Sequence, residues 1–267
     1  RLLSQIERLT QSNDYGFKIS QHKATTLVMR DKQHMTTLVV EVLTTTRGNL
    51  FPDPAFDAVQ AIIYSFQNED ENLQDTGSRP DLRTGLIVVA AEDVNVDRLG
   101  LSHLALEVVE DELELFNTLI DLVRAFDPEI IVGWEIHSSS WGYIIERASK
   151  EYDFDLVPQI GRSIVHNTGR AGGKSDNYAY TQSSALRITG RHTLNLWRLM
   201  KGELTLNLYT LENVCYHLLH RRIPKFSHQT LTQWFKSGRA ELVRKALLYY
   251  VDMVELELEI ISESEFV

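Results

Sequence analysis

The chain has 267 residues, of which 43% are hydrophobic and 24% charged, a composition typical of a folded protein with a sizeable core. Lys and Arg number 27 against 37 Asp and Glu, and the formal charge of −10 argues against a stand-alone protein that binds nucleic acid with its whole surface. A local basic groove, or a partner domain that carries the positive charge, stays compatible with this balance. The single cysteine, Cys215, excludes an internal disulfide and a cysteine-based zinc site.

Both ends of the sequence predict a piece of a longer protein. The chain starts at Arg1 with no visible signal peptide, and it ends in an amphipathic helical pattern without a stop signal. No apolar run approaches the ~18 residues that a membrane-spanning helix needs.

Short apolar runs bounded by Gly, Pro and polar turns predict strands. The expected strands are 25–29, 35–43, 58–66, 85–90, 104–109 and 129–134. Apolar residues spaced by three and four predict helices instead. The expected helices are 1–12, the segment between Asp111 and Pro128, 141–151, 193–201, 209–221, 228–237 and 240–262.

The alternation of strands and helices after residue 100 predicts a mixed α/β sheet. Residues 68–83 are polar and contain Gly77 and Pro80, so a loop is expected there. Residues 152–186 are rich in Gly, Ser and Asn and predict a long flexible insertion.

Four segments resemble, in the same order, the 3′–5′ exonuclease domain of the family B DNA polymerases. They are 40–43 with Phe51–Pro52–Asp53–Pro54, then 126–136 running into 143–148, then Gly190–Arg191 with 208–214, and last Tyr250. Residues 140–143 and 193–198 extend the resemblance to the translesion, zeta-type branch of that family. The resemblance implies a ribonuclease-H-like α/β domain over 35–267, with a mixed sheet of about five strands, flanking helices and extra C-terminal helices. Residues 1–34 are then an N-terminal connecting segment.

The resemblance also implies where nuclease chemistry belongs. Active members of the family use carboxylates to hold two Mg²⁺ ions about 4 Å apart, and Mg²⁺ needs hard oxygen ligands. Their first motif places two acids two residues apart on a strand, so that both face the same side. Glu41 and Leu43 stand at these positions, and the leucine cannot bind a metal.

The remaining acidic positions of the family are also altered. Ser140 stands where an Asp precedes a helix, and its hydroxyl is expected to cap that helix instead. Tyr250 of the third motif is present, but Val254 stands four residues later, where the family has an acid. Asp252 faces elsewhere, because two residues turn a helix by about 200°. Asn195 occupies a further position that is often acidic in the family.

These substitutions favour a degenerate domain without an intact catalytic or metal site, and with Leu43 and Val254 buried. Glu41 is interpreted either as a relic ligand or, preferably, as a charge paired with a nearby Arg or His, and Tyr250 as core packing. Two alternatives stay open. One is an active exonuclease with an unorthodox ligand set such as Glu41, Asp252 and Glu135, and the other is a pure protein-interaction module.

The most basic stretch of the sequence is 217–228. Its cations Arg221, Arg222 and Lys225 form either a surface that contacts DNA or another subunit, or the cationic end of a helix, where they complement the helix dipole. The sequence alone supports both interpretations.

For the longer chain, the resemblance implies a nuclear DNA-directed DNA polymerase that acts in translesion DNA synthesis and repair. Its cofactors would be Mg²⁺ and a 4Fe–4S cluster, both held outside these residues. Its partners would be primer–template DNA, the palm, fingers and N-terminal domains of the same chain, a HORMA-type accessory subunit and the small subunits of polymerase delta. No membrane partner is expected.

Overall fold

The computed structural model describes residues 35–68, 82–90, 99–101, 103–163 and 186–264. The helix expected at 1–12, the strand expected at 25–29 and the rest of the segment 1–34 lie outside the described residues. So does most of the expected insertion, although its first residues hold a short helix, α3 (Val157–Ile160). Within the described ranges, no helix is both long and apolar enough to cross a membrane.

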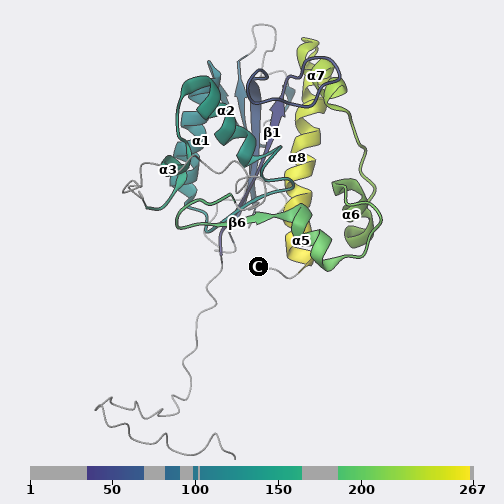
Figure 1. Cartoon of the computed structure of the whole chain (residues 1–267). Coiled ribbons are helices and arrows are strands. Elements are labelled where there is room, and N and C mark those ends of the chain that lie inside the picture. The colour runs from purple at the N-terminus through teal and green to yellow at the C-terminus, as the bar shows by residue number, and fades with distance from the viewer. Residues whose placement is uncertain (1–34, 69–81, 91–98, 102, 164–185, 265–267) are drawn as a thin grey trace, which may run out of the picture. The chain divides into compact units, whose positions relative to one another are not determined.

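A mixed sheet of six strands organises the domain, in the order β4-β3-β2-β1-β5-β6 (Figure 1). The strands are β1 (Thr37–Thr44), β2 (Val59–Gln67), β3 (Leu82–Val89), β4 (Ala105–Val109), β5 (Ile130–Gly133) and β6 (His192–Asn195). Strand β2 is antiparallel to β1 and β3, while the pairs β3–β4, β1–β5 and β5–β6 are parallel. The helix-flanked mixed sheet confirms the expected ribonuclease-H-like α/β fold.

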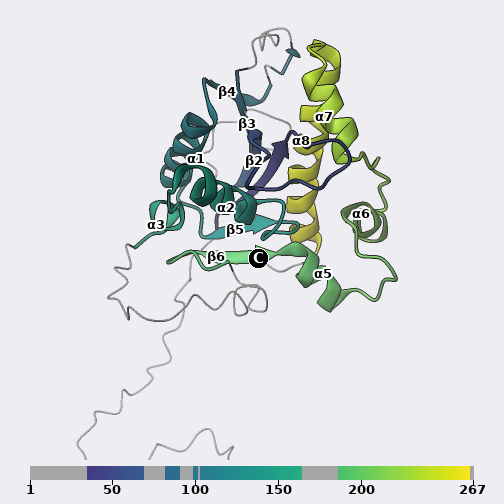
Figure 2. The ribbon, with the colours of Figure 1, turned by 45° about the horizontal axis from the view of Figure 1, so that its top comes forward.

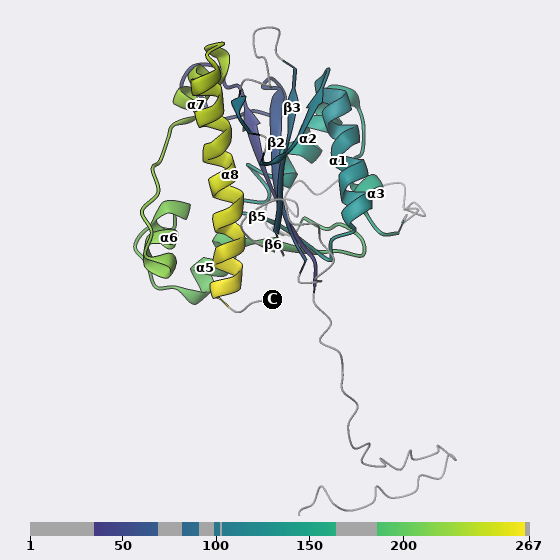
Figure 3. The same ribbon diagram turned by 180° about the vertical axis from the view of Figure 1, so that it is seen from behind.

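Helices cover both faces of the sheet (Figures 1 and 3). One face carries α1 (Glu112–Phe126), α2 (Trp141–Tyr152) and α3. The long helix α8 (Ala240–Glu263) lies against β1 and β2 on the other face. Beside α8 lie α5 (Leu196–Glu203), α6 (Leu211–Leu219) and α7 (His228–Lys236).

Strand β1 is central, and all of its residues are buried. Because successive side chains of a strand point to opposite faces, Val39 and Leu43 enter the apolar cluster on the α8 side, whereas Val40 and Val42 enter the cluster under α1 and α2. Glu41 therefore shares the α8 side with Val39 and Leu43. This confirms that positions 41 and 43 share one face.

Within the described residues the expected helices and strands are present apart from two segments, and the sheet has six strands where about five were expected. Strand β3 begins at Leu82, so it takes the end of the expected loop 68–83. The helix expected at 193–201 is a strand, β6, followed directly by α5 (Figure 2). Strand β6 lies at the sheet edge, with its first residue exposed and the other three partly exposed. Its four residues form no apolar run, and its strand structure comes from pairing with β5.

A buried ion pair joins the helices on one face to the connection between β1 and β2. Arg147 of α2 donates from Nε and Nη2 to Glu112 of α1, at 3.0–3.2 Å, and from Nη1 to the carbonyl oxygen of Pro54 at 3.2 Å. Glu112 also accepts from the backbone N–H of Val59 and from the hydroxyl of Tyr152. The pair therefore fixes the start of β2 against α1 and α2.

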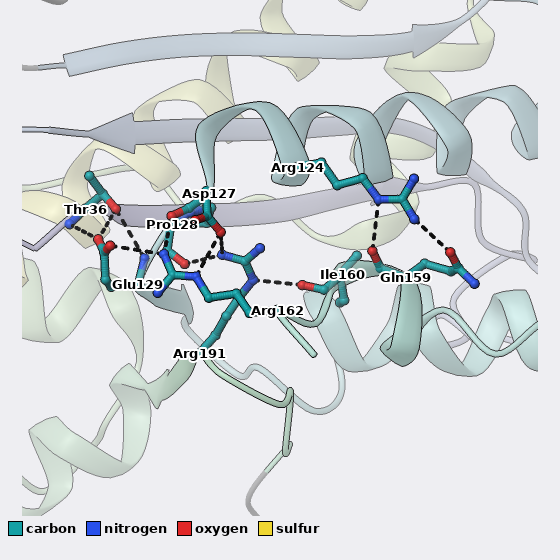
Figure 4. A network of polar contacts seen from close by, with 9 residues as sticks. All are labelled: Thr36, Arg124, Asp127, Pro128, Glu129, Gln159, Ile160, Arg162 and Arg191. Carbon is teal, nitrogen blue, oxygen red and sulfur yellow. Dashed lines mark hydrogen bonds and ion pairs between the residues drawn. The ribbon is translucent and has the colours of Figure 1, made fainter. Parts of the chain in front are cut away.

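A second polar network surrounds the turn between α1 and β5 (Figure 4). Arg162 and Arg191 both bind the carboxylate of Asp127, at 2.9 and 2.8 Å. Arg162 also pairs with Glu129, whose other oxygen accepts from the backbone N–H of Thr36 at 2.7 Å. Arg162 and Arg191 lie on either side of segment 164–185, so the network holds the chain before and after that segment to the same turn.

Candidate functional site

The positions implied by the resemblance come from four elements. Glu41 and Leu43 lie on β1, Tyr250 and Val254 on α8, Ser140 at the start of α2, and Asn195 at the end of β6. The structure brings the first four together at the contact between β1 and α8, because Leu43, Tyr250 and Val254 belong to one buried apolar cluster and the charge of Glu41 acts on Tyr250.

Glu41 is a buried carboxyl group in the middle of the sheet. It lies opposite Ile63 of β2, is 3% exposed, and accepts a hydrogen bond from the backbone N–H of Trp134 at 3.3 Å. Burial raises the pKa of Glu41 to about 7, although hydrogen bonds from Glu257 and from Trp134 oppose this rise. The expected pairing with an Arg or His is therefore wrong, since the partner is a second carboxyl group.

Glu257 of α8 is the site residue that the sequence reasoning missed. It is fully buried, and burial followed by the charge of Glu41 raises its pKa well above the ordinary value. When both groups are ionised neither can donate, and the two oxygens of Glu257 are then left without a hydrogen-bond partner at bonding distance, although the nearby N–H of Trp134 acts to lower the pKa of Glu257. A signal was present in the sequence, because Glu257 follows Val254 by three residues and so continues the buried stripe of the helix.

Hydrocarbon occupies the positions of the other acids on these two elements. Leu43 and Val254 are both fully buried, which confirms the expected burial. Tyr250 is 7% exposed, and the pKa of its hydroxyl is raised first by burial and then by the charge of Glu41. Tyr250 is therefore part of the apolar cluster, as expected.

Ser140 is fully buried but does not cap α2, which corrects the expectation from sequence. Its hydroxyl donates to the carbonyl oxygen of Val40 on β1, at 2.5 Å. The loop before α2 is packed closely against the sheet here, because a Cβ atom on Gly133 would lie 2.4 Å from Oγ of Ser140. The side chain is thus directed to the sheet and away from the first turn of its own helix.

Asn195 has a local structural role. Its side-chain oxygen accepts a hydrogen bond from the backbone N–H of Arg198 at 3.2 Å and so caps α5. Asn is among the preferred residues for this position. The amide is used at the helix terminus and has no link to Glu41.

The alternative ligands Asp252 and Glu135 are not gathered with Glu41 into a metal site. Glu135 is exposed and accepts from the hydroxyl of Ser138 at 2.8 Å. Asp252 is also exposed and lines a separate cavity of about 270 Å³ beside Phe226 and Arg244. Among the described residues, no group of three or more His, Cys, Asp or Glu side chains could hold a metal ion. The residues present do not fit a pair of Mg²⁺ ions.

The three cations expected at a DNA or subunit surface all contact other side chains of the chain. Arg221 pairs with Glu259 at 2.6 Å, and Lys225 lies 3.6 Å from Glu212. The guanidinium of Arg222 lies over the ring of Tyr216, 5.2 Å from its centre. All three cations remain exposed, so contact with DNA or with another subunit stays a prediction.

Comparison with known proteins places this geometry in a family. The family model for DNA polymerase family B, exonuclease domain, matches residues 5–214. The DNA polymerase zeta catalytic subunit of Homo sapiens is 34% identical over 280 aligned residues, which cover 99% of this chain and 9% of that protein. Its counterpart in Saccharomyces cerevisiae is 32% identical over 238 residues, which cover 87% of this chain and 15% of that protein.

A less similar relative is the catalytic subunit of a different DNA polymerase. The DNA polymerase delta catalytic subunit of Glycine max is 25% identical over 225 residues, which cover 83% of this chain and 19% of that protein. The chain thus spans less than a fifth of the length of each of these relatives. With a family model that covers most of its length and a ribonuclease-H-like sheet, the chain belongs to the exonuclease-domain family of the family B DNA polymerases.

Proposed function

We propose that this domain is a degenerate exonuclease-like domain that does not hydrolyse DNA. The observation that carries the proposal is the packing between β1 and α8. Leu43 and Val254 fill with hydrocarbon the positions where two-metal chemistry needs carboxylates, and both are fully buried. Ser140 offers a hydroxyl that already donates to Val40, and Asn195 offers an amide that caps α5. What remains is one buried pair of carboxyl groups, Glu41 and Glu257.

The loss of hydrolysis fits a role in translesion DNA synthesis within a zeta-type polymerase. An active exonuclease would remove the nucleotides that such a polymerase had just added opposite damage or at a distorted primer end. In this role the domain is a structural module that packs against the palm, fingers and N-terminal regions and helps to shape the DNA channel. The 32–34% identity to zeta catalytic subunits supports this assignment.

The same identity supports proposals for the longer chain. That chain would transfer nucleotides to a primer with Mg²⁺ and carry a 4Fe–4S cluster outside this domain. It would act in the nucleus on primer–template DNA, with a HORMA-type accessory subunit and the small subunits of polymerase delta as partners.

The test is a nuclease assay on the 267-residue chain. Single-stranded and 3′-mismatched primers are incubated with Mg²⁺ and, separately, with Mn²⁺, beside an active family B exonuclease domain as positive control. We expect no release of 3′ nucleotides above a blank without protein. Metal-dependent release that Glu41→Ala abolishes would overturn the proposal in favour of an active exonuclease with an unorthodox ligand set.

A second assay addresses the role in the DNA channel. In the whole polymerase, a photocrosslinker at Arg222 is expected to label primer–template DNA, with Ser262 of α8 as an exposed control position. Labelling of protein subunits alone would favour a module for protein interaction and would contradict the proposed role in the channel.

A further inference from the structure

The buried carboxyl pair joins the two elements that carry the altered nuclease motifs. Glu41 lies on β1, where it pairs with Ile63 of β2 just beyond the last residue paired with β5, and Glu257 lies on the buried face of α8. Their relative exposures are 3% and 0%. Both groups are therefore shielded from solvent. Ionising either carboxyl group without a hydrogen-bond donor beside it would lower the free energy of unfolding substantially.

The neighbours of the pair come from the end of β5, from α8 and from α6. From the end of β5, the backbone N–H of Trp134 donates to Glu41, and the charge of Glu135 repels it. From α8 and α6, the pKa values of Tyr250, Tyr249 and Cys215 are raised, first by burial and further by the charge of Glu41 or Glu257. Tyr250, Tyr249 and Cys215 are weak acids, so none of these three supplies a positive charge to the pair.

Two ionised carboxylates at this place would repel each other and leave the oxygens of Glu257 unsatisfied. One proton removes both penalties, because the protonated group donates to the ionised one and the shared negative charge keeps the N–H of Trp134 as a donor. We propose that Glu257 keeps its proton when Glu41 ionises and donates it to the Glu41 carboxylate, in a carboxyl–carboxylate hydrogen bond that ties α8 to β1.

The proposal predicts how stability depends on pH. In the folded chain the pKa of Glu41 is raised to about 7, whereas an unfolded Glu titrates near 4.5. Between these values the folded chain keeps protons on the pair that the unfolded chain has released, because the pKa of Glu257 is raised as well. The contribution of Glu41 is therefore complete below about 4.5 and is lost as the pH rises through about 7, whereas Glu257, whose pKa is raised partly by the charge of Glu41, keeps its proton when Glu41 ionises. One such proton raises the unfolding equilibrium constant by up to about tenfold per pH unit in this window.

The experiment is urea unfolding of the 267-residue chain, followed by tryptophan fluorescence, at half-unit steps from pH 5 to pH 8. Four variants are compared with the unchanged chain: Glu41→Gln, Glu257→Gln, the double variant and Glu263→Gln. The last is the matched control, because it makes the same change of charge at an exposed position on the same helix. The histidines are the same in all five proteins, so they do not contribute to the differences between them.

We expect the unfolding constant of the unchanged chain and of Glu263→Gln to rise more steeply with pH than that of the double variant, by up to two protons below about pH 7 and by about one proton above it. Each single Gln variant should lose most of this extra slope, because an amide donates to the remaining carboxylate at every pH. The double variant keeps a hydrogen bond between two amides, so it decides the matter if a single variant does not fold.

Two results would overturn the inference. If the double variant has the same slope as the unchanged chain, the pair holds no proton in this range. If each single variant keeps half of the extra slope, the two groups titrate independently and no hydrogen bond joins them.

A parallel series with and without 5 mM Mg²⁺ at matched ionic strength separates this inference from the proposed function. We expect no Mg²⁺-specific shift of the urea midpoint. A saturable shift that Glu41→Gln removes would identify a cation site and exclude the hydrogen bond between the two carboxyl groups. The inference concerns stability alone, so it can fail while the chain still lacks nuclease activity, and the nuclease assay can succeed or fail whatever the pH profile.

Discussion

The hydroxyl of Ser140 donates to the carbonyl oxygen of Val40 across a distance of 2.5 Å, and this bond links the start of α2 to the central strand. The resemblance to the family implies an Asp at this position in its active members. A carboxylate can only accept a hydrogen bond, whereas the serine hydroxyl donates one. The carbonyl oxygen of Val40 receives its hydrogen bond from this hydroxyl.

We expect Ser140→Asp to destabilise the domain without restoring hydrolysis. The carboxylate would have no proton to donate, would face the carbonyl oxygen of Val40, and would have no room, since Gly133 lies directly against Oγ of Ser140. The loss in the free energy of unfolding should exceed about 2 kcal/mol. Urea titration measures it, with Ser138→Asp as an exposed control that should cost less than about 1 kcal/mol. A loss no larger than that of the control would show that the site is open to water.

A similar argument applies to the buried apolar positions. Leu43→Asp and Val254→Asp each place a third carboxyl group beside Glu41 and Glu257 in a region without water. Each should cost several kcal/mol at neutral pH. Because burial would raise the pKa of the new carboxyl, the loss should shrink as the pH falls, and Leu43→Asn and Val254→Asn should show no such recovery. Unchanged melting temperatures for both Asp variants would instead indicate a wet cleft.

The sequence predicted most of this site because the site follows local periodicity. The alternation along β1 puts Glu41 and Leu43 on one face of the strand, and the helical period of α8 puts Tyr250 and Val254 on one face of the helix. Only the packing of these two faces against each other had to be assumed. The partner of Glu41 could not be predicted in this way. A buried carboxylate normally has a cation as its partner, and this expectation pointed to Arg or His.

The remaining failures have the same cause, which is tertiary contact. Strand β6 has no apolar pattern of its own and exists because β5 offers it a parallel edge. Ser140 has the sequence signature of a helix cap, but a carbonyl oxygen on β1 takes its hydroxyl. In both cases a partner distant in sequence outweighs the local preference.

The buried ion pair between Arg147 and Glu112 leads to a third prediction. Arg147→Met leaves the carboxylate of Glu112 buried with only the N–H of Val59 and the hydroxyl of Tyr152 as donors. We expect a loss of about 3–5 kcal/mol in the free energy of unfolding. Lys150→Met is the control on the same helix, since Lys150 pairs with Glu146 in solvent, where such a pair contributes less than about 1 kcal/mol. Equal losses in the two variants would contradict the structural role of Arg147.

The network around Asp127 predicts an acid-dependent part of the stability. Hydrogen bonds from Arg162 and Arg191 lower the pKa of Asp127, whereas its partial burial opposes the shift. A lowered pKa in the folded state stabilises the chain above the ordinary value of 3.8, and this part is lost as the pH falls through the folded-state value. Asp127→Asn removes the charge but keeps a residue that tolerates the left-handed backbone found here, with φ of 43°. The variant should therefore lose stability at pH 7, by no more than about 1 kcal/mol because the carboxylate is half exposed, and should differ less from the unchanged chain at pH 3.

The two arginines of this network should differ in their effect. The side chain of Arg191 is 3% exposed and donates to the carbonyl oxygens of Ile160 and Pro128 as well as to Asp127, whereas that of Arg162 is 31% exposed. Arg191→Gln strands two buried carbonyl oxygens, so we expect it to cost at least about 1 kcal/mol more than Arg162→Gln. Urea midpoints at pH 7 measure both variants, and Arg198→Gln, an exposed change on α5 that removes the same positive charge, controls for charge alone. If Arg162→Gln proved the more damaging of the two, the turn would be held mainly from the segment before 164–185, and the buried bonds of Arg191 would contribute little to the stability of the domain.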